Sequence, residues 1–432
     1  MLNKVGMVSL GCSKNRVDSE QLLGMLTSCG FATVSDPSLA DVIIVNTCGF
    51  IDAAKEDSIV NILEMAKFKE NGNCKYLVVT GCLSQRYKED LETELPEVDM
   101  FYGVSEYEEL AKRLASLCGL DKNTINCGGR LLTTPNFRAY LRIADGCDNR
   151  CTYCAIPLIR GGRKSVPMEN LIEEATRLAE NGVTELTVIA QDTTSYGTDI
   201  YGESRIRELL RELAKIAKLK WIRLLYTYPN TVDEKLIDTI VSEEKLLNYI
   251  DMPIQHIDSE MLKRMNRHGT REHIEDIVKY IRKAAPDFVL RTTAIVGFPG
   301  ETDEQFDELV RFMEENPFDR LGAFTYSQED GTPASEFDGQ IDEDVKQSRY
   351  DRLYSMQQPI SLEFNKKRVG SMGTVLVEMR DGDTLYCRSY AEAPEIDGFI
   401  VVNDAPEDIN EGDYITVKLV EAKEYYMIGE LA

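Results

Sequence analysis

Three cysteines that lie close together in the sequence are the residues with the clearest potential for chemistry. Cys147, Cys151 and Cys154 lie in the segment GCDNRCTYCAIPLIRG, residues 146–161, with the spacing Cys-x3-Cys-x2-Cys. A structural zinc site needs four ligands, and no fourth cysteine or histidine lies near this segment. On a four-iron cluster, three thiolates leave one iron open to a substrate or cofactor, whereas an electron carrier normally has a cysteine on every iron.

The alternative is that the three are structural cysteines, buried as small hydrophobic residues. That alternative gives no reason for all three to share one polar loop bounded by glycines. The spacing therefore favours a reactive metal site.

The first 118 residues alternate short apolar runs with amphipathic stretches, a pattern that predicts strands and helices in turn. The predicted strands are residues 5–10, 42–45, 76–79 and 98–102, and the predicted helices are residues 16–28, 52–67, 85–94 and 106–117. This alternation predicts a parallel sheet covered by helices.

A cysteine follows three successive predicted strands, in the sequences VSLGC, VNTC and VTGC. Residues just past the carboxyl ends of parallel strands converge on one edge of the sheet. Cys12, Cys48 and Cys82 are therefore expected to meet there. Each alone could be a buried hydrophobic residue, but three equivalent positions favour a shared site. The other cysteines are interpreted as structural or incidental: Cys29, Cys74, Cys118, Cys127 and Cys387.

The loop of Cys147, Cys151 and Cys154 resembles that of the radical S-adenosylmethionine (SAM) enzymes. The resemblance implies that these cysteines hold a [4Fe-4S] cluster whose open iron binds SAM, and that Tyr153 lies against the cofactor. It also implies reductive cleavage of SAM to a 5′-deoxyadenosyl radical.

Two three-cysteine sets in this order are similar to those of the methylthiotransferases, a subgroup of the radical SAM enzymes. The similarity covers essentially the whole chain and rests on the segments SLGCSKNRVDSE, NTCGFIDAAKEDS, GCLSQRY and CDNRCTYCAIPLIRG. It implies that Cys12, Cys48 and Cys82 hold an auxiliary [4Fe-4S] cluster, whose open iron carries the sulfur to be delivered. All six cysteines would then be catalytic.

From Arg138 the alternation of strands and helices resumes and predicts six strands, at residues 139–143, 185–189, 221–226, 249–252, 288–296 and 321–326. Six units are fewer than the eight of a closed barrel. They suit the open, partial (β/α)6 barrel of the radical SAM enzymes, an α/β fold. In such barrels the site collects at the carboxyl ends of the strands.

Three of these strand ends carry polar or glycine-rich sequence: AQDTTSYG, PIQH and VGFPGET. The last resembles the family's SAM-contacting turn, which implies cofactor contacts from Val296, Gly297 and Gly300. Gln191 matches the cofactor- or substrate-facing region of the family loosely. Together with Asp192, it could equally cap the loop.

The remaining segments complete the expected domain organisation. Residues 119–137 form a linker, and residues 341–367 a long polar helix with Pro359 as a candidate break. Five short β-type runs then predict a small barrel, closed or nearly closed, which resembles the TRAM domain that ends many methylthiotransferases. We expect a methylthiotransferase N-terminal domain at 1–118, a radical SAM core at 138–366 and a TRAM domain at 367–432.

The charge balance argues against a nucleic acid partner. Acidic residues outnumber basic ones by 74 to 49, whereas a protein that holds an RNA backbone usually presents a basic face. From Gly370 onward, four basic residues stand against fourteen acidic ones, a net charge of −10. Such a module should repel phosphate and attract a basic protein.

Within the subgroup, SLGCSKNRVDSE, TCGFID and IAQDTTSYG are most similar to the type that methylthiolates the β-carbon of an aspartate. Its substrate is a basic small-subunit ribosomal protein of the decoding centre. A flavodoxin- or ferredoxin-like electron donor is implied, and the sulfur donor is not indicated. The alternatives are a methylthiotransferase of transfer RNA adenosine and a non-enzymatic iron–sulfur protein.

Composition places this expected enzyme in the cytoplasm. The apolar runs are too short to cross a membrane, and the first residues lack the features of a signal peptide. Eleven cysteines in so large a chain indicate metal or catalytic use rather than disulfides. The three histidines, His256, His268 and His273, are expected to be solvated or packed against helices.

Overall fold

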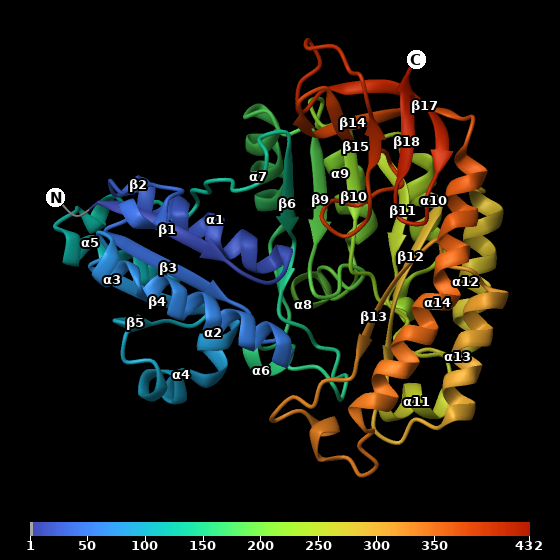
Figure 1. Cartoon of the computed structure of the whole chain (residues 1–432), viewed down its shortest axis with the longest axis horizontal. Helices are drawn as coiled ribbons and strands as arrows, with labels where there is room; N and C mark the ends of the chain where they lie inside the picture. The colour runs from blue at the N-terminus through green and yellow to red at the C-terminus, as the bar shows by residue number, and fades with distance from the viewer. Residues whose placement is uncertain (1–2) are drawn as a thin grey trace. The chain divides into compact units, whose positions relative to one another are not determined.

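The computed structural model describes residues 3–432, which form two compact units (Figure 1). The first unit is built from the chain up to Thr134, together with Asp145–Lys164 and Ser327–Ser335. The second unit contains Pro135–Ala144, Ser165–Tyr326 and Glu336–Ala432. The segment with the three closely spaced cysteines therefore belongs to the same unit as the N-terminal sheet.

The first unit contains a parallel sheet with the strand order β2-β1-β3-β4-β5. Its strands are β1 (Lys4–Ser9), β2 (Ala32–Thr33), β3 (Val42–Thr47), β4 (Tyr76–Gly81) and β5 (Met100–Phe101). Its helices are α1 (Ser13–Ser28), α2 (Asp52–Ala66), α3 (Phe68–Asn71), α4 (Cys82–Glu94), α5 (Tyr107–Cys118) and α6 (Ile156–Arg160), with short 3-10 turns at Pro37–Leu39 and Lys122–Thr124.

Alternating strand residues give this sheet two apolar faces. Val42, Ile44 and Val78 pack against α1 and α5, while Ile43 and Val79 pack against α2 and α4. Because both faces are covered, β3 is buried along its whole length. The predicted parallel sheet with covering helices is confirmed.

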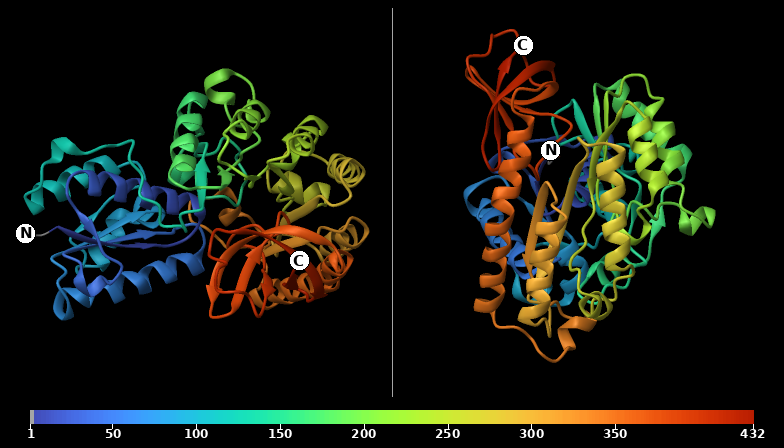
Figure 2. Two further views of the ribbon diagram at one scale, coloured as in Figure 1. Left: turned by 90° about the horizontal axis from the view of Figure 1, so that it is seen from above. Right: turned by 90° about the vertical axis from the view of Figure 1, so that its right-hand side faces the viewer.

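The second unit contains a six-stranded parallel sheet whose order, β6-β9-β10-β11-β12-β13, follows the sequence. The strands are β6 (Arg138–Arg142), β9 (Glu185–Ile189), β10 (Trp221–Leu224), β11 (Leu246–Asp251), β12 (Val289–Val296) and β13 (Arg320–Thr325). The intervening helices are α7 (Met168–Glu180), α8 (Thr198–Tyr201), α9 (Ile206–Ala214), α10 (Glu234–Ser242), α11 (Ser259–Arg264), α12 (Arg271–Ala284) and α13 (Asp303–Glu315). Figure 2 shows the longer helices lined up along the sheet. The open arrangement of six strands agrees with the prediction.

Short elements complete this part of the chain. The pair β7 (Ala144–Asp145) and β8 (Lys164–Ser165) forms a two-stranded sheet where the chain passes from one unit to the other. The 3-10 turns lie at Pro229–Thr231 and Pro333–Glu336. Across residues 3–432, no helix combines the length and the apolar character needed to cross a membrane.

The long helix α14 (Glu343–Arg368) continues through Pro359, so the candidate break there is wrong. Side chains on both sides of the proline hold the helix in place. The Gln357 amide donates to the Phe318 carbonyl at 2.9 Å, and the Asn365 amide donates to the Lys423 carbonyl at 2.7 Å. These bonds attach one continuous helix to the end of the central sheet and to the C-terminal barrel.

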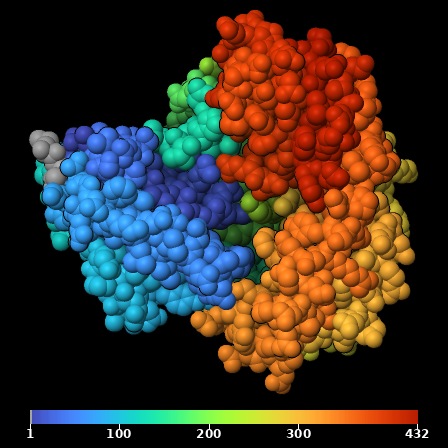
Figure 3. Space-filling model, in the orientation of Figure 1, coloured from blue at the N-terminus to red at the C-terminus, as the bar shows by residue number. Residues whose placement is uncertain are grey.

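The C-terminal residues form a closed barrel of five strands in the order β14-β15-β16-β18-β17, as predicted. The strands are β14 (Met372–Asp381), β15 (Thr384–Arg388), β16 (Ile400–Val402), β17 (Tyr414–Ala422) and β18 (Met427–Leu431). Buried aliphatic residues such as Val375, Leu385 and Val417 fill its interior. In the space-filling view the barrel residues form one continuous red body (Figure 3).

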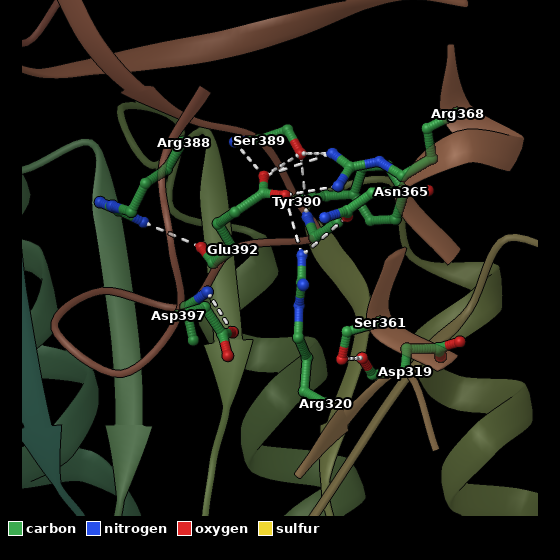
Figure 4. A network of polar contacts seen from close by, with 12 residues as sticks. Asp319, Arg320, Ser361, Asn365, Arg368, Arg388, Ser389, Tyr390, Glu392 and Asp397 are labelled. Atoms are coloured by element: carbon green, nitrogen blue, oxygen red, sulfur yellow. Dashed lines mark hydrogen bonds and ion pairs between the residues drawn. The ribbon is translucent and has the colours of Figure 1, made fainter. Parts of the chain in front are cut away.

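Buried ion pairs attach the barrel to the amino ends of the central strands, and Figure 4 shows those that Glu392 forms. Arg388 of β15 forms two hydrogen bonds with Glu185, the first residue of β9, at 3.0 and 2.5 Å. Glu392 accepts from Arg320, the first residue of β13, at 3.3 Å and from Arg368 at 2.5 Å. The barrel therefore leaves the carboxyl ends of the strands uncovered.

Candidate metal centres

Cys12, Cys48 and Cys82 lie at three neighbouring strand ends in the first unit. Cys12 precedes α1, Cys48 follows β3, and Cys82 is the first residue of α4. Two glycines allow these segments to approach closely. A Cβ on Gly11, whose φ is +83°, would lie 3.0 Å from the Cys48 sulfur, and a Cβ on Gly49 would lie 2.9 Å from the Cys82 carbonyl carbon. The three cysteines, far apart in sequence, are thus brought together.

Two asparagines join the first two strand ends through their side chains. The buried Asn15 amide donates to the carbonyl oxygens of Leu10 at 2.7 Å and Thr47 at 3.2 Å. In return, the Asn46 amide donates to the Asn15 carbonyl at 2.8 Å. These bonds link the start of α1 to the ends of β1 and β3, and they fix the backbone on either side of Cys12 and just before Cys48.

A buried serine fixes the Cys48 backbone from the helix that follows. The Cys48 N–H donates to the Ser58 hydroxyl at 3.1 Å, and that hydroxyl lies 3.0 Å from the Cys48 carbonyl oxygen. Sequence reasoning missed the roles of Asn15, Asn46 and Ser58, although all three lie in or beside the segments that carry the family resemblance. For Asn15 and Asn46 the signal was a polar residue near a strand-end cysteine, whereas Ser58, ten residues after Cys48, gave no such signal.

The second cysteine set lies on a loop that is closed at its base. The Cys147 N–H donates to the Gly161 carbonyl at 3.1 Å, and the Cys154 N–H donates to the Cys151 carbonyl at 3.1 Å. Cys147 and Cys151 are buried, whereas Tyr153 and Cys154 are half-buried. The loop therefore has a fixed backbone and a partly accessible rim.

The two cysteine sets belong to one unit, and residues beside one set contact the other. Ala155, which follows Cys154, packs with Ile159 of α6 against the Cys82 side chain. The helix that continues the second set therefore lies directly on the first.

A buried guanidinium extends this contact. Arg160 Nη2 lies 3.4 Å from the Cys82 sulfur and 2.8 Å from an Asp18 oxygen, and Nη1 lies 3.0 Å from Asp145. Burial raises the pKa of the Cys82 thiol to about 12, against the opposing influence of Arg160, and burial also raises the pKa of Cys48. Without metal these thiols stay protonated, so binding of a metal must release protons.

The chemistry of both donor sets fits iron–sulfur clusters, which proteins hold by cysteine thiolates. In residues 3–432 no three His, Cys, Asp or Glu side chains surround one point as the ligands of a single ion would. In an iron–sulfur cluster, each cysteine thiolate binds a different iron. Six thiols in two sets of three, one at the strand ends and one on a short loop, match that requirement.

The remaining predicted site residues lie at carboxyl ends of strands in the second unit. Gln191 follows β9, and Val296 ends β12. Gly297 and Gly300 form a turn with φ of +73° and +79°; the Gly297 N–H donates to Glu301 at 2.7 Å. Their contact with a cofactor stays a prediction.

Asp192 has the loop-capping role that the sequence analysis gave as an alternative. Its carboxylate accepts the Thr194 and Ser195 hydroxyls, each at 2.7 Å. It therefore caps the loop that follows β9.

Glu301 is a buried residue that sequence reasoning missed. Its carboxylate holds the Gly297 N–H, lies 3.2 Å from His256 Nε2, and accepts from Arg349 at 2.5 Å. His256 Nδ1 accepts the Asp258 N–H at 3.0 Å, so the neutral ring carries its proton on Nε2 and donates to Glu301. The expectation of a solvated or helix-packing role is wrong for His256, because it is fully buried in this polar cluster.

Comparisons with known proteins agree with this architecture. Residues 141–313 match the radical SAM superfamily, and residues 369–432 match the TRAM domain. Residues 4–103 match the uncharacterized protein family UPF0004. The chain is 46% identical over 436 residues to the ribosomal protein uS12 methylthiotransferase RimO of Clostridium botulinum (strain Eklund 17B / Type B), covering 99% of this chain and 97% of the relative. The chain belongs to the RimO family.

Other members of the RimO family are similarly related. The protein of Clostridium perfringens (strain 13 / Type A) is 48% identical over 438 residues, and that of Clostridioides difficile (strain 630) is 47% identical over 438 residues. Both matches cover 99% of this chain, with 97% and 98% of the relatives.

Among solved structures, the radical SAM methyltransferase TsrM of Kitasatospora setae, with cobalamin and a [4Fe-4S] cluster bound, matches with a TM-score of 0.54. This match covers 94% of the chain and 88% of TsrM at 14% identity. OxsB, a cobalamin-dependent radical SAM enzyme, gives a TM-score of 0.51 at 14% identity, covering 84% of the chain and 62% of OxsB. At this identity the matches support the fold alone.

Proposed function

We propose that this chain is a methylthiotransferase that places a methylthio group on the β-carbon of an aspartate in ribosomal protein uS12. The observation that carries the proposal is the presence of two three-cysteine sets within one unit, in a chain that shares 46–48% identity with RimO proteins over 99% of its length. One such set is enough to bind and cleave SAM. Sulfur insertion needs a second cluster as well, with an open iron that can carry the sulfur.

Each cysteine set would hold one [4Fe-4S] cluster. Cys147, Cys151 and Cys154 would bind the cluster that takes SAM, and the strand-end cysteines Cys12, Cys48 and Cys82 would bind the auxiliary one. When bound, the clusters and SAM supply a radical able to abstract hydrogen from carbon, together with the sulfur that is transferred. The protein keeps both sets on fixed backbone, through the bonds described above.

Five residues are assigned to contacts with SAM, by their match to family motifs: Tyr153, Gln191, Val296, Gly297 and Gly300. The structure supports a positioning role for Glu301 at this turn. Its carboxylate holds the Gly297 N–H and is itself fixed by two buried partners, His256 and Arg349. Because the buried Glu301 carboxylate accepts from three donors, the backbone of the turn has little conformational freedom. A fixed backbone suits a turn that contacts a ligand.

The substrate is expected to be recognised by charge. The C-terminal barrel carries a net charge of −10, so it repels nucleic acid and attracts a protein rich in lysine and arginine. The proposal places the reaction in the cytoplasm, with a flavodoxin- or ferredoxin-like protein as the electron donor.

The test is anaerobic turnover of the reconstituted enzyme with SAM, reductant and sulfide. A peptide that carries the uS12 aspartate loop competes with transfer RNA, and mass spectrometry measures both products. We expect one methylthio group on the peptide aspartate and none on RNA. Modification of adenosine would overturn the assigned substrate, and SAM cleavage with neither product would overturn the assigned transfer reaction.

Substitutions should separate the two cysteine sets. Cys151→Ala should abolish both SAM cleavage and product, because the SAM-binding cluster loses a ligand. Cys48→Ala should retain SAM cleavage but stop methylthiolation. Cys127→Ala is the matched control, since Cys127 is exposed and outside both sets, and it should behave as the wild type. Product formation by Cys48→Ala would show that the auxiliary site is wrongly assigned.

A further inference from the structure

Arg160 is a buried cation to which the proposed reaction assigns no role. We propose that Arg160 is a positioning residue of the auxiliary site, which holds Cys82 in its ligating position by a hydrogen bond to sulfur. In this role it also ties the auxiliary cysteine set to the segment that carries the other set. The inference rests on the proposed function, because it takes Cys82 as a cluster ligand.

The geometry that supports this role is a guanidinium shared by three segments of the first unit. Nη2 lies 3.4 Å from the Cys82 sulfur at the start of α4 and 2.8 Å from Asp18 of α1. Nη1 lies 3.0 Å from Asp145, two residues before Cys147. The Arg160 and Asp18 side chains are 2% and 1% exposed. The position of the guanidinium, and with it that of Cys82, is therefore set from several directions.

Stability alone is a poor explanation for this arrangement. A buried ion pair costs so much desolvation that well-packed apolar residues of similar size are often as stable. Asp18 balances the charge of Arg160, yet the same nitrogen that meets Asp18 also lies within hydrogen-bond distance of a sulfur. Such a bond becomes stronger when the sulfur is a metal-bound thiolate, because the acceptor then carries charge.

A hydrogen bond to a cluster sulfur has a defined electrochemical consequence. Hydrogen bonds and charges around the sulfurs set the reduction potential of an iron–sulfur cluster. A buried cation stabilises the reduced form, which carries one more negative charge. Arg160 should therefore raise the potential of the auxiliary cluster.

The same residue couples the two sites mechanically. α6 begins two residues after Cys154 and ends at Arg160. Its residue Ile159 packs on Cys82, together with Ala155, which directly precedes the helix. Any movement of the second cysteine loop therefore reaches Cys82 through packing and through the guanidinium. A lysine would keep the charge but not the planar fork that meets Asp145 and Cys82 from different nitrogens.

The experiment isolates the auxiliary cluster by substituting Cys147, Cys151 and Cys154 with alanine in the full chain. Arg160→Met and Arg160→Lys are compared in this background. The matched control is Arg130→Met, which removes another buried arginine of the same unit, paired with Glu20 at 2.6 Å. Iron per chain and the reduction potential, from a titration followed by electron paramagnetic resonance, are measured, and circular dichroism checks folding.

We expect a more negative potential or a loss of iron in Arg160→Met, a smaller change in Arg160→Lys, and the parent's values in Arg130→Met. If Arg160→Met does not fold, Arg160→Lys carries the test. Parent values in the folded Arg160 variants, or an equal change in Arg130→Met, would overturn the inference. Absence of a cluster from the parent itself would instead contradict the proposed auxiliary site, so the two failures are distinguishable.

Discussion

At the scale of single residues, the proposed auxiliary site requires the backbone at Gly11 to pass close to Cys48. Gly11 lies against Cys48, and the Cβ of any other residue would stand 2.8 Å from the Cys48 Cβ. The backbone there also has a φ of +83°, which L-residues adopt at a cost of about 1–2 kcal/mol. Gly11→Ala should therefore lower the thermal midpoint of unfolding and displace Cys48, with loss of iron from the auxiliary set.

Gly119→Ala separates the two effects. Gly119 has a similar φ of +73°, but a Cβ there would meet nothing within 4 Å. This variant should show the backbone cost alone and retain its iron. Equal iron content in the two variants would mean that the contact with Cys48 does not control ligand placement.

At the scale of elements, α14 shows tertiary contacts overriding a local signal. Pro359 lies exposed inside the helix, where proline costs about 3 kcal/mol relative to alanine. Pro359→Ala should therefore stabilise the protein, partly offset because proline also restricts the unfolded chain. A rise in the thermal midpoint is expected, whereas Gln358→Ala, at the exposed neighbouring position, should change it little. An unchanged or lower midpoint for Pro359→Ala would show that the helix has adapted to its proline.

The contrast between local sequence signals and tertiary contacts also explains which features the sequence could predict and which it could not. Apolar periodicity correctly indicated both parallel sheets and the barrel, because the burial of strands such as β3 is a property of neighbouring residues. The meeting of Cys12, Cys48 and Cys82 followed from the rule for strand ends. Arg160 and Glu301 were assigned no role and His256 the wrong one, because each has a partner that is distant along the chain. His256 and Glu301 are 45 residues apart, and Arg160 and Asp18 are 142 residues apart. A polar residue near a motif gives no sign of which distant group it will meet.

At the scale of the whole second unit, the barrel is held to the central sheet by buried charges at the edge opposite the strands' carboxyl ends. Glu392 connects three elements, because it accepts from Arg368 of α14 and Arg320 of β13 and also from Ser389 beside the barrel (Figure 4). A module attached in this way keeps one orientation, so its acidic surface can serve as a fixed recognition face.

Acid should weaken this attachment. Burial alone would raise the pKa of Glu392, but Arg368 and Arg320 outweigh it and hold the pKa at about 2, below the ordinary value of 4.5. Because the folded-state pKa is depressed, the stabilisation is complete above about pH 4.5. It is lost as the pH falls toward 2. Thermal midpoints of the wild type should therefore fall across this window.

Glu392→Gln tests whether Glu392 is the group that causes the loss of stability in acid. Removing one partner of a buried ion pair costs about 3–5 kcal/mol, because Arg368 and Arg320 would keep buried charges without their anion. The variant should therefore melt at a lower temperature near neutral pH and lose less stability than the wild type between pH 4.5 and 2. Glu407→Gln, at an exposed barrel position, should follow the wild type at every pH. Parallel pH profiles for the wild type and Glu392→Gln would show that another group controls the attachment of the barrel.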